Sequence, residues 1–150
     1  HNGKELLYTF IHFPVLNWTH RIINNEYTTV GRAPNFTLSA VAKDTIIYWS
    51  GDPKKTTPSL YNELSAKGLK FSEIQKVSID FGSITMLSCN KVAGIYREDP
   101  NVYDSIVELH MAKARGLKIY TGGGFDLSNI KKRESGFYYP GYYLVLTQTA

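Results

Sequence analysis

The sequence has one cysteine in 150 residues, which excludes an internal disulfide and any metal site built from several cysteines. It has no run approaching the roughly 18 apolar residues of a membrane span, so no membrane span is predicted. Its 4 histidines show no close spacing of the His-x-x-x-His kind. We therefore predict no metal site, and we predict no cofactor.

The charge balance is also limited, with 17 lysines and arginines against 13 acids and a net charge of +4. This surplus suits an acidic partner but is too small to require nucleic acid. Hydrophobic residues at 43% and charged residues at 20% are typical of a globular protein, and the length fits one domain covering residues 1–150. The 11 tyrosines favour strands and contact surfaces.

Continuous apolar runs of strand length, typical of strands buried on both faces of a parallel sheet, occur at Thr45–Ser50, Ser83–Cys89 and Leu117–Thr121. Between them, helices are predicted from Thr57-Pro58 to Gly68 and from Asp104 or Ser105 to about Arg115. The pattern predicts one three-layer α/β domain with a mostly parallel central sheet. Antiparallel strands are expected at its margins, from Leu6–Phe13, Tyr27–Val30, Phe137–Tyr139 and Tyr142–Thr147.

The carboxyl ends of parallel strands meet at one edge of a sheet, and that edge is where such sheets bind and react. Cys89 ends the second predicted strand and is the candidate nucleophile, with an inert, buried thiol as the alternative. Residues that follow the strand ends are candidate substrate contacts, through acidic or amide side chains or through glycines that let a ligand approach the backbone: Asp52, Asn90, Gly122, Gly123 and Asp126.

The chain contains, in order, Thr45-Ile-Ile-Tyr-Trp-Ser-Gly-Asp52, a predicted helix, Gly82-Ser-Ile-Thr-Met-Leu-Ser-Cys-Asn90, a second predicted helix and Gly116-Leu-Lys-Ile-Tyr120. This order of segments resembles the caspase-like cysteine peptidases. The likeness is closest to self-processing domains of large secreted bacterial toxins and of polymorphic toxins. It implies a Cys89 nucleophile, oxyanion stabilisation by amides near Ser50 and Gly51, and a protein or peptide substrate, the parent chain included. It also implies a domain of a longer protein that is secreted or delivered into a target cell.

The sequence departs from this family at the catalytic histidine, whose position falls at about Ser50, and serine cannot act as the base. Three interpretations stay open. Peptidase activity is altered or lost; another histidine, from among His12, His20 and His110, serves as the base; or the likeness is limited to sheet architecture. His110 also fits a structural role on the apolar side of its helix.

Two further hypotheses come from other classes of protein. A small basic toxin domain acting on RNA or a nucleotide would use Lys54 and Lys55 at a helix start. It would also use Lys131, Lys132 and Arg133, which precede the aromatic run Phe137–Tyr139 and could grip a single strand by charge and stacking. A basic hairpin turn is the simpler interpretation of that stretch. The last hypothesis is a non-catalytic adaptor that binds another protein through a tyrosine-rich surface.

Overall fold

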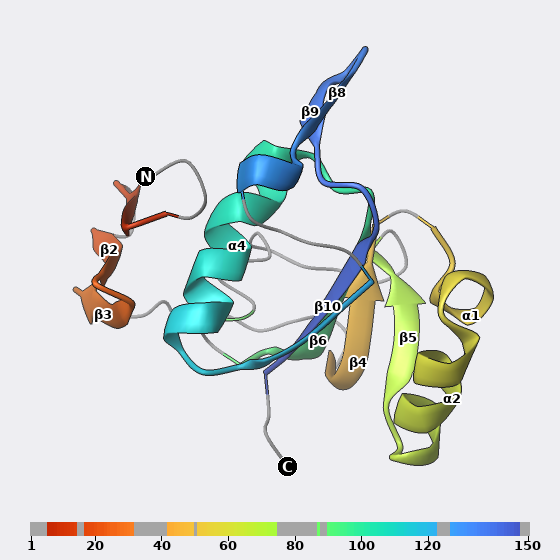
Figure 1. Ribbon diagram of the computed structural model, residues 1–150. Helices are drawn as coiled ribbons and strands as arrows, with labels where there is room; N and C mark the ends of the chain where they lie inside the picture. The colour runs from red at the N-terminus through yellow and green to blue at the C-terminus, as the bar shows by residue number, and fades with distance from the viewer. Residues whose placement is uncertain are drawn as a thin grey trace.

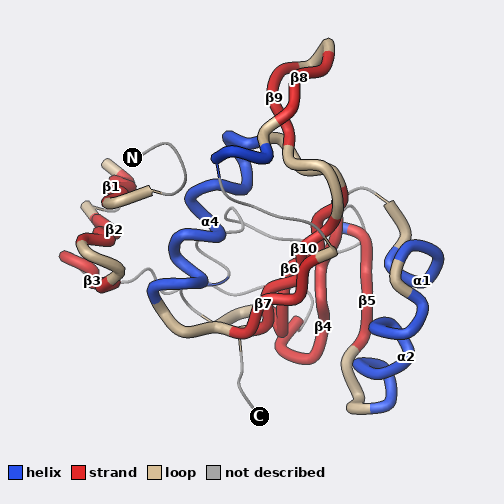
Figure 2. The backbone as a smooth tube through the Cα atoms, viewed as in Figure 1, coloured by secondary structure: helices blue, strands red, loops and turns tan. Residues whose placement is uncertain are grey.

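A computed structural model of the chain describes residues 6–14, 17–31, 42–49, 51–74, 87, 90–122 and 127–147. Within these residues the strands form a five-stranded sheet, a three-stranded sheet and a two-stranded hairpin (Figures 1 and 2).

The five-stranded sheet has the strand order β5-β4-β6-β10-β7. β4 runs parallel to both β5 and β6, whereas β10 runs antiparallel to its two neighbours β6 and β7. The strands are β4 (Ala42–Tyr48), β5 (Lys70–Glu73), β6 (Val92–Glu98), β7 (Lys118–Thr121) and β10 (Tyr142–Leu146).

Helices lie on both sides of this sheet: α1 (Pro53–Thr56) and α2 (Pro58–Ala66) on one side, and α4 (Val102–Ala114) on the other (Figure 1). Successive strand residues alternate between the two sides, because side chains point to opposite faces of a strand. The cluster that includes α2 is Ile46, Leu64, Ala93, Tyr96, Leu144 and Leu146. The cluster that includes α4 is Ile22, Ile47, Leu87, Val92, Ile95, Met111, Ala112, Tyr143 and Val145.

The three-stranded sheet is antiparallel, with the order β1-β2-β3, and its strands are β1 (Tyr8–Phe13), β2 (Trp18–Ile23) and β3 (Glu26–Val30). Asn24 and Asn25 connect β2 to β3 with φ angles of 51° and 60°, a left-handed conformation that asparagine tolerates in tight turns. The inner face of the three-stranded sheet carries the buried side chains Thr9, Trp18, His20 and Ile22. Ile22 joins the core cluster that contains Met111 and Ala112, so this sheet packs against α4.

The hairpin of β8 (Lys131–Arg133) and β9 (Gly136–Tyr138) projects from the body of the protein near the amino end of α4 (Figure 1). A short 3-10 helix, η2 (Leu127–Asn129), precedes it. Among the residues that the structure describes, no helix is long and apolar enough to cross a membrane.

The predicted three-layer, mostly parallel α/β fold is wrong. The described residues are 46% strand and 27% helix, in a mixed sheet and in separate antiparallel sheets. One cause lies in Tyr142–Leu146, which was expected at a margin. Every residue of this strand is apolar or aromatic, so it is buried on both faces and lies inside the sheet as an antiparallel strand. β7, expected as a buried strand, forms the half-exposed edge beside it.

The predicted strand Ser83–Cys89 fails at Leu87, its only described residue, which is helical. The next described strand, β6, begins at Val92, after Cys89 in the chain. The expected basic turn at Lys131–Arg133 is instead strand β8. β9 pairs with β8 rather than with β10. The predicted helices correspond to α2, with Thr57 at its N-cap and Pro58 at its first position, and to α4.

The attachment of α2 to the sheet gives a test of this packing. Leu64 is fully buried, whereas Leu60 on the same helix is half-buried. We expect Leu64→Ala to lower the free energy of unfolding by about 2–5 kcal/mol, because it removes buried methyl groups and leaves a cavity. Urea denaturation measures this, with Leu60→Ala as the matched control. An equal loss in both variants would contradict the placement of Leu64 in the core.

Candidate functional site

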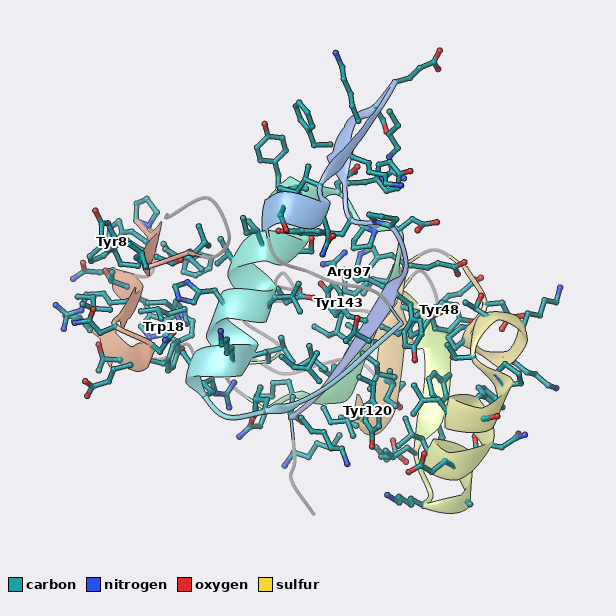
Figure 3. All side chains as sticks on the ribbon, in the orientation of Figure 1. Tyr8, Trp18, Tyr48, Arg97, Tyr120 and Tyr143 are labelled. Carbon is teal, nitrogen blue, oxygen red and sulfur yellow. The ribbon has the colours of Figure 1, made fainter. Side chains whose placement is uncertain are left out.

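A buried ion pair crosses the core between β6 and α4. The Arg97 guanidinium donates from Nε to Glu108 Oε1 at 3.0 Å and from Nη2 to Oε2 at 3.2 Å. The Tyr143 hydroxyl on β10 donates to Glu108 Oε1 at 2.5 Å. Glu108 and Tyr143 are 0% exposed, and a carboxylate buried in this way requires hydrogen-bond donors such as these. The cluster fastens α4 to two neighbouring strands, and Figure 3 shows Arg97 and Tyr143 together between α4 and the sheet.

The surroundings of this pair are aromatic. The Arg97 guanidinium lies 4.1 Å from the centroid of the Trp49 ring, which follows β4.

Burial, together with the nearby Glu108 carboxylate, raises the pKa of Tyr143 well above the ordinary tyrosine value. Burial likewise raises the pKa of Tyr96, on the other face of β6, to about 12. The phenols and the ion pair are held inside the protein, which favours a structural role for them.

The carboxyl ends of β4 and β6 lie side by side, as expected for parallel strands. A Cβ atom at Gly51 would collide with the Glu98 carboxylate, and Gly51 has a φ of 77° that favours glycine. The Thr56 hydroxyl donates to Glu98 Oε2 at 3.1 Å. Asp52 caps α1, since its carboxylate accepts from the Lys54 amide at 3.0 Å. This edge is therefore occupied by two carboxylates.

Lys54 and Lys55 lie exposed on α1, where the sequence suggested an anion site. The geometry gives little support to that hypothesis, because the Lys54 amide already donates to Asp52 and Glu98 lies against the preceding glycine. An anion would have to approach both acids. These lysines are better described as a solvated helix surface.

His20 and His110 lie apart from this edge, where the three-stranded sheet packs on α4. His20 Nδ1 is 2.5 Å from the Tyr27 hydroxyl, and its ring is 4.1 Å from that of Trp18. Burial, with a smaller contribution from Arg115, lowers the pKa of His20. His110 Nδ1 is 2.7 Å from the Thr9 hydroxyl. Both are buried and hydrogen-bonded between two elements of the fold, which favours a structural role.

Asn90 and Gly122 also have structural explanations. The Arg115 guanidinium donates to the Leu87 carbonyl at 2.7 Å and to Asn90 Oδ1 at 3.1 Å, so it holds the turn that precedes β6. Gly122 lies so close to Tyr142 that a Cβ atom would collide with its ring, and its amide donates to the Tyr142 carbonyl at 3.1 Å.

Cys89, Ser50, Gly123 and Asp126 lie outside the described residues. The cysteine-peptidase hypothesis, with its protein or peptide substrate and its secreted location, therefore stays a prediction. Among the described residues no group of three or more acids, histidines and cysteines could hold a metal ion.

The β8–β9 hairpin brings basic and aromatic side chains to the surface. Lys131 and Lys132 are exposed, and Phe137, the cross-strand partner of Lys132, is 45% exposed. Arg133 Nη2 donates to Asn101 Oδ1 at 2.7 Å, and its guanidinium lies 4.5 Å from the centroid of the Tyr138 ring. Asn101 also forms a β-bridge with Tyr138.

Sequence reasoning missed two parts of this surface, the Asn101 anchor and Tyr103. Tyr103 lies in the first turn of α4, two residues after Asn101, and is 81% exposed. The one available signal was an aromatic residue near a helix start, and that signal does not distinguish a buried ring from an exposed one.

No family model matches this chain, and a search of curated proteins also finds no match.

The buried ion pair gives a direct prediction for stability. We expect Glu108→Gln to lower the free energy of unfolding by about 3–5 kcal/mol, because it removes one charge of a buried, hydrogen-bonded ion pair. Glu63→Gln makes the same chemical change on the surface of α2, where Glu63 is 51% exposed and 3.7 Å from Lys67. We expect that control to cost less than about 1 kcal/mol. Similar denaturation midpoints for both variants would exclude an important role for the buried pair.

His20 gives a prediction for pH dependence. When the pKa of a histidine is lower in the folded than in the unfolded protein, its contribution to stability is complete at pH values above the unfolded pKa. That contribution is lost as the pH falls below the unfolded pKa and through the folded pKa. We expect stability to decline below pH 6.5, the ordinary histidine value, and His20→Gln to decline less steeply. His12→Gln, at an exposed histidine on neighbouring β1, is the control. Thermal unfolding across pH 5–7 measures the slopes, and identical slopes for the wild type and His20→Gln would refute this explanation.

Proposed function

We propose that this domain binds single-stranded nucleic acid through its β8–β9 hairpin. The observation that carries the proposal is the pairing of Lys132 with Phe137 across the two strands, with both side chains at the surface. A cation beside an exposed ring matches the two needs of single-strand binding, namely phosphate attraction and base stacking.

Charge supports the hairpin as the binding element. The hairpin contains three basic residues, Lys131, Lys132 and Arg133, and one acidic residue, Glu134. No described carboxylate forms an ion pair with Lys131 or Lys132. On α1, by contrast, the Lys54 amide already donates to the Asp52 carboxylate, and the Glu98 carboxylate lies against the preceding Gly51. The hairpin is therefore better suited than α1 to attract a phosphate backbone.

Rigidity at the base of the hairpin also supports the proposal. Arg133 is fixed by Asn101 and Tyr138, and the Tyr139 amide donates to the Pro100 carbonyl at 3.0 Å. These contacts hold the hairpin beside the first turn of α4, which carries the exposed Tyr103 ring. An element that is ordered before binding loses less conformational entropy when it binds.

The test is the affinity for a short fluorescent single-stranded RNA, measured by anisotropy over a range of salt concentrations. We expect Lys131→Gln/Lys132→Gln to weaken binding and to reduce the slope of log K against log salt by about 1.4, since each phosphate contact on a single strand contributes about 0.7. We expect Phe137→Ala to weaken binding by about 1–3 kcal/mol through the loss of one stacked base.

Lys54→Gln/Lys55→Gln is the matched control, because it removes the same two charges from another exposed element. We expect it to change affinity much less than the hairpin variant. Equal losses in the two double variants would mean that net charge alone attracts RNA. No binding by the wild type, even at low salt, would contradict the proposal altogether.

A further inference from the structure

The outer face of the three-stranded sheet carries four exposed apolar or aromatic side chains. Tyr8 is 64% exposed, Phe10 59%, Ile23 44% and Val30 48%. Strand alternation places these four on the face turned away from α4, opposite the buried Trp18 and His20. In Figure 3 Tyr8 and Trp18 lie on different sides of this sheet. Tyr8, Phe10 and Ile23 lie together, whereas Val30 lies opposite Thr19 toward the other end of the sheet. An exposed apolar group of this kind marks a candidate interaction site.

The register defines the pattern on this face. Tyr8 lies opposite Ile23, which lies opposite Glu26, and Phe10 lies opposite Arg21. Beside the aromatic residues is a hollow of about 290 Å³, lined by Arg21, Ile23, Asn24, Glu26 and Thr28. The face therefore combines projecting rings, from Tyr8 and Phe10, with a shallow, open hollow whose lining is mainly polar.

The charges on this face are self-complementary. Arg21 and Glu26 are diagonal neighbours across β2 and β3, yet no ion pair joins either of them to a described residue. Arg21 Nε is buried and donates to no described group. With one cation and one acid, this face has no net charge, although the whole chain has a net charge of +4. The face therefore offers no particular attraction to a strongly charged partner.

We infer that this face binds a second copy of the chain about a two-fold axis. In such an interface each surface meets itself, so Arg21 of each copy faces Glu26 of the other, and each pair forms twice. Phe10 of each copy fills the hollow of its partner. A face of zero net charge with one cation and one acid fits this occupant better than it fits a nucleic acid or a basic or acidic peptide.

The size of the face sets the strength of this dimer. Five residues along each of three strands span roughly 17 Å by 14 Å, which is smaller than the roughly 800 Å² per partner of a standard interface. The dimer is therefore weak, with a dissociation constant in the micromolar range or above.

Sedimentation velocity of the full chain, without nucleic acid and over a range of concentrations, tests the dimer separately from the proposed function. We expect a concentration-dependent dimer in the wild type and monomers for Arg21→Glu and for Glu26→Arg. The double variant Arg21→Glu/Glu26→Arg should dimerise again, since it restores both pairs with reversed sign. Phe10→Ser should weaken the dimer at least tenfold, and Glu63→Arg on α2 should leave it unchanged.

Circular dichroism and thermal unfolding confirm that each variant is folded. A wild-type chain that stays monomeric at about millimolar concentration would overturn the inference. So would a folded double variant that stays monomeric while the wild type dimerises, or a dimer that tolerates Phe10→Ser. The first of these results would also leave the face to a different partner.

Discussion

The ion pair between Arg97 and Glu108 is the interaction on which the rest of this structure depends. It lies inside an apolar core, where each charge would be costly without the other, and Tyr143 satisfies the same carboxylate. The three side chains come from β6, α4 and β10, so the pair fixes the position of α4 relative to the central sheet. α4 in turn carries His110, which contacts the three-stranded sheet at Thr9.

The same pair also determines where the hairpin lies. Arg97 and Glu108 flank Asn101 in the chain, and Asn101 holds both Arg133 and Tyr138. Fixing β6 and α4 together therefore fixes the residue that anchors the base of the hairpin. The basic surface proposed to bind nucleic acid is coupled in this way to a buried charge pair in the core. The outer face of the three-stranded sheet is coupled to it through α4.

Elements with strong local signals could be predicted from the sequence. Thr57, Pro58 and Gly68 marked the limits of α2, and the aromatic and branched residues of β1 marked a strand. β6 was missed because Gly94 and Arg97 interrupt its apolar pattern. Both have tertiary causes, since a Cβ atom at Gly94 would collide with the Val145 carbonyl and Arg97 is paired with Glu108.

The site was predictable in its composition but not in its geometry. Lys131–Arg133 and the following aromatic residues were visible as a basic and aromatic stretch. Their presentation depends on Asn101, which lies about thirty residues away and has no local signature of an anchor. His20 and His110 were considered as catalytic bases because of their residue type alone. Their burial against Tyr27 and Thr9 could only be learned from the packing of α4 on the three-stranded sheet.

The most direct test of the central claim is an NMR titration of the ¹⁵N-labelled protein with a short single-stranded RNA. We expect the largest amide shift changes in β8, in β9 and in the first turn of α4, with little change in α1. Changes centred on α1 or on the outer face of the three-stranded sheet, or no changes at all, would contradict the account.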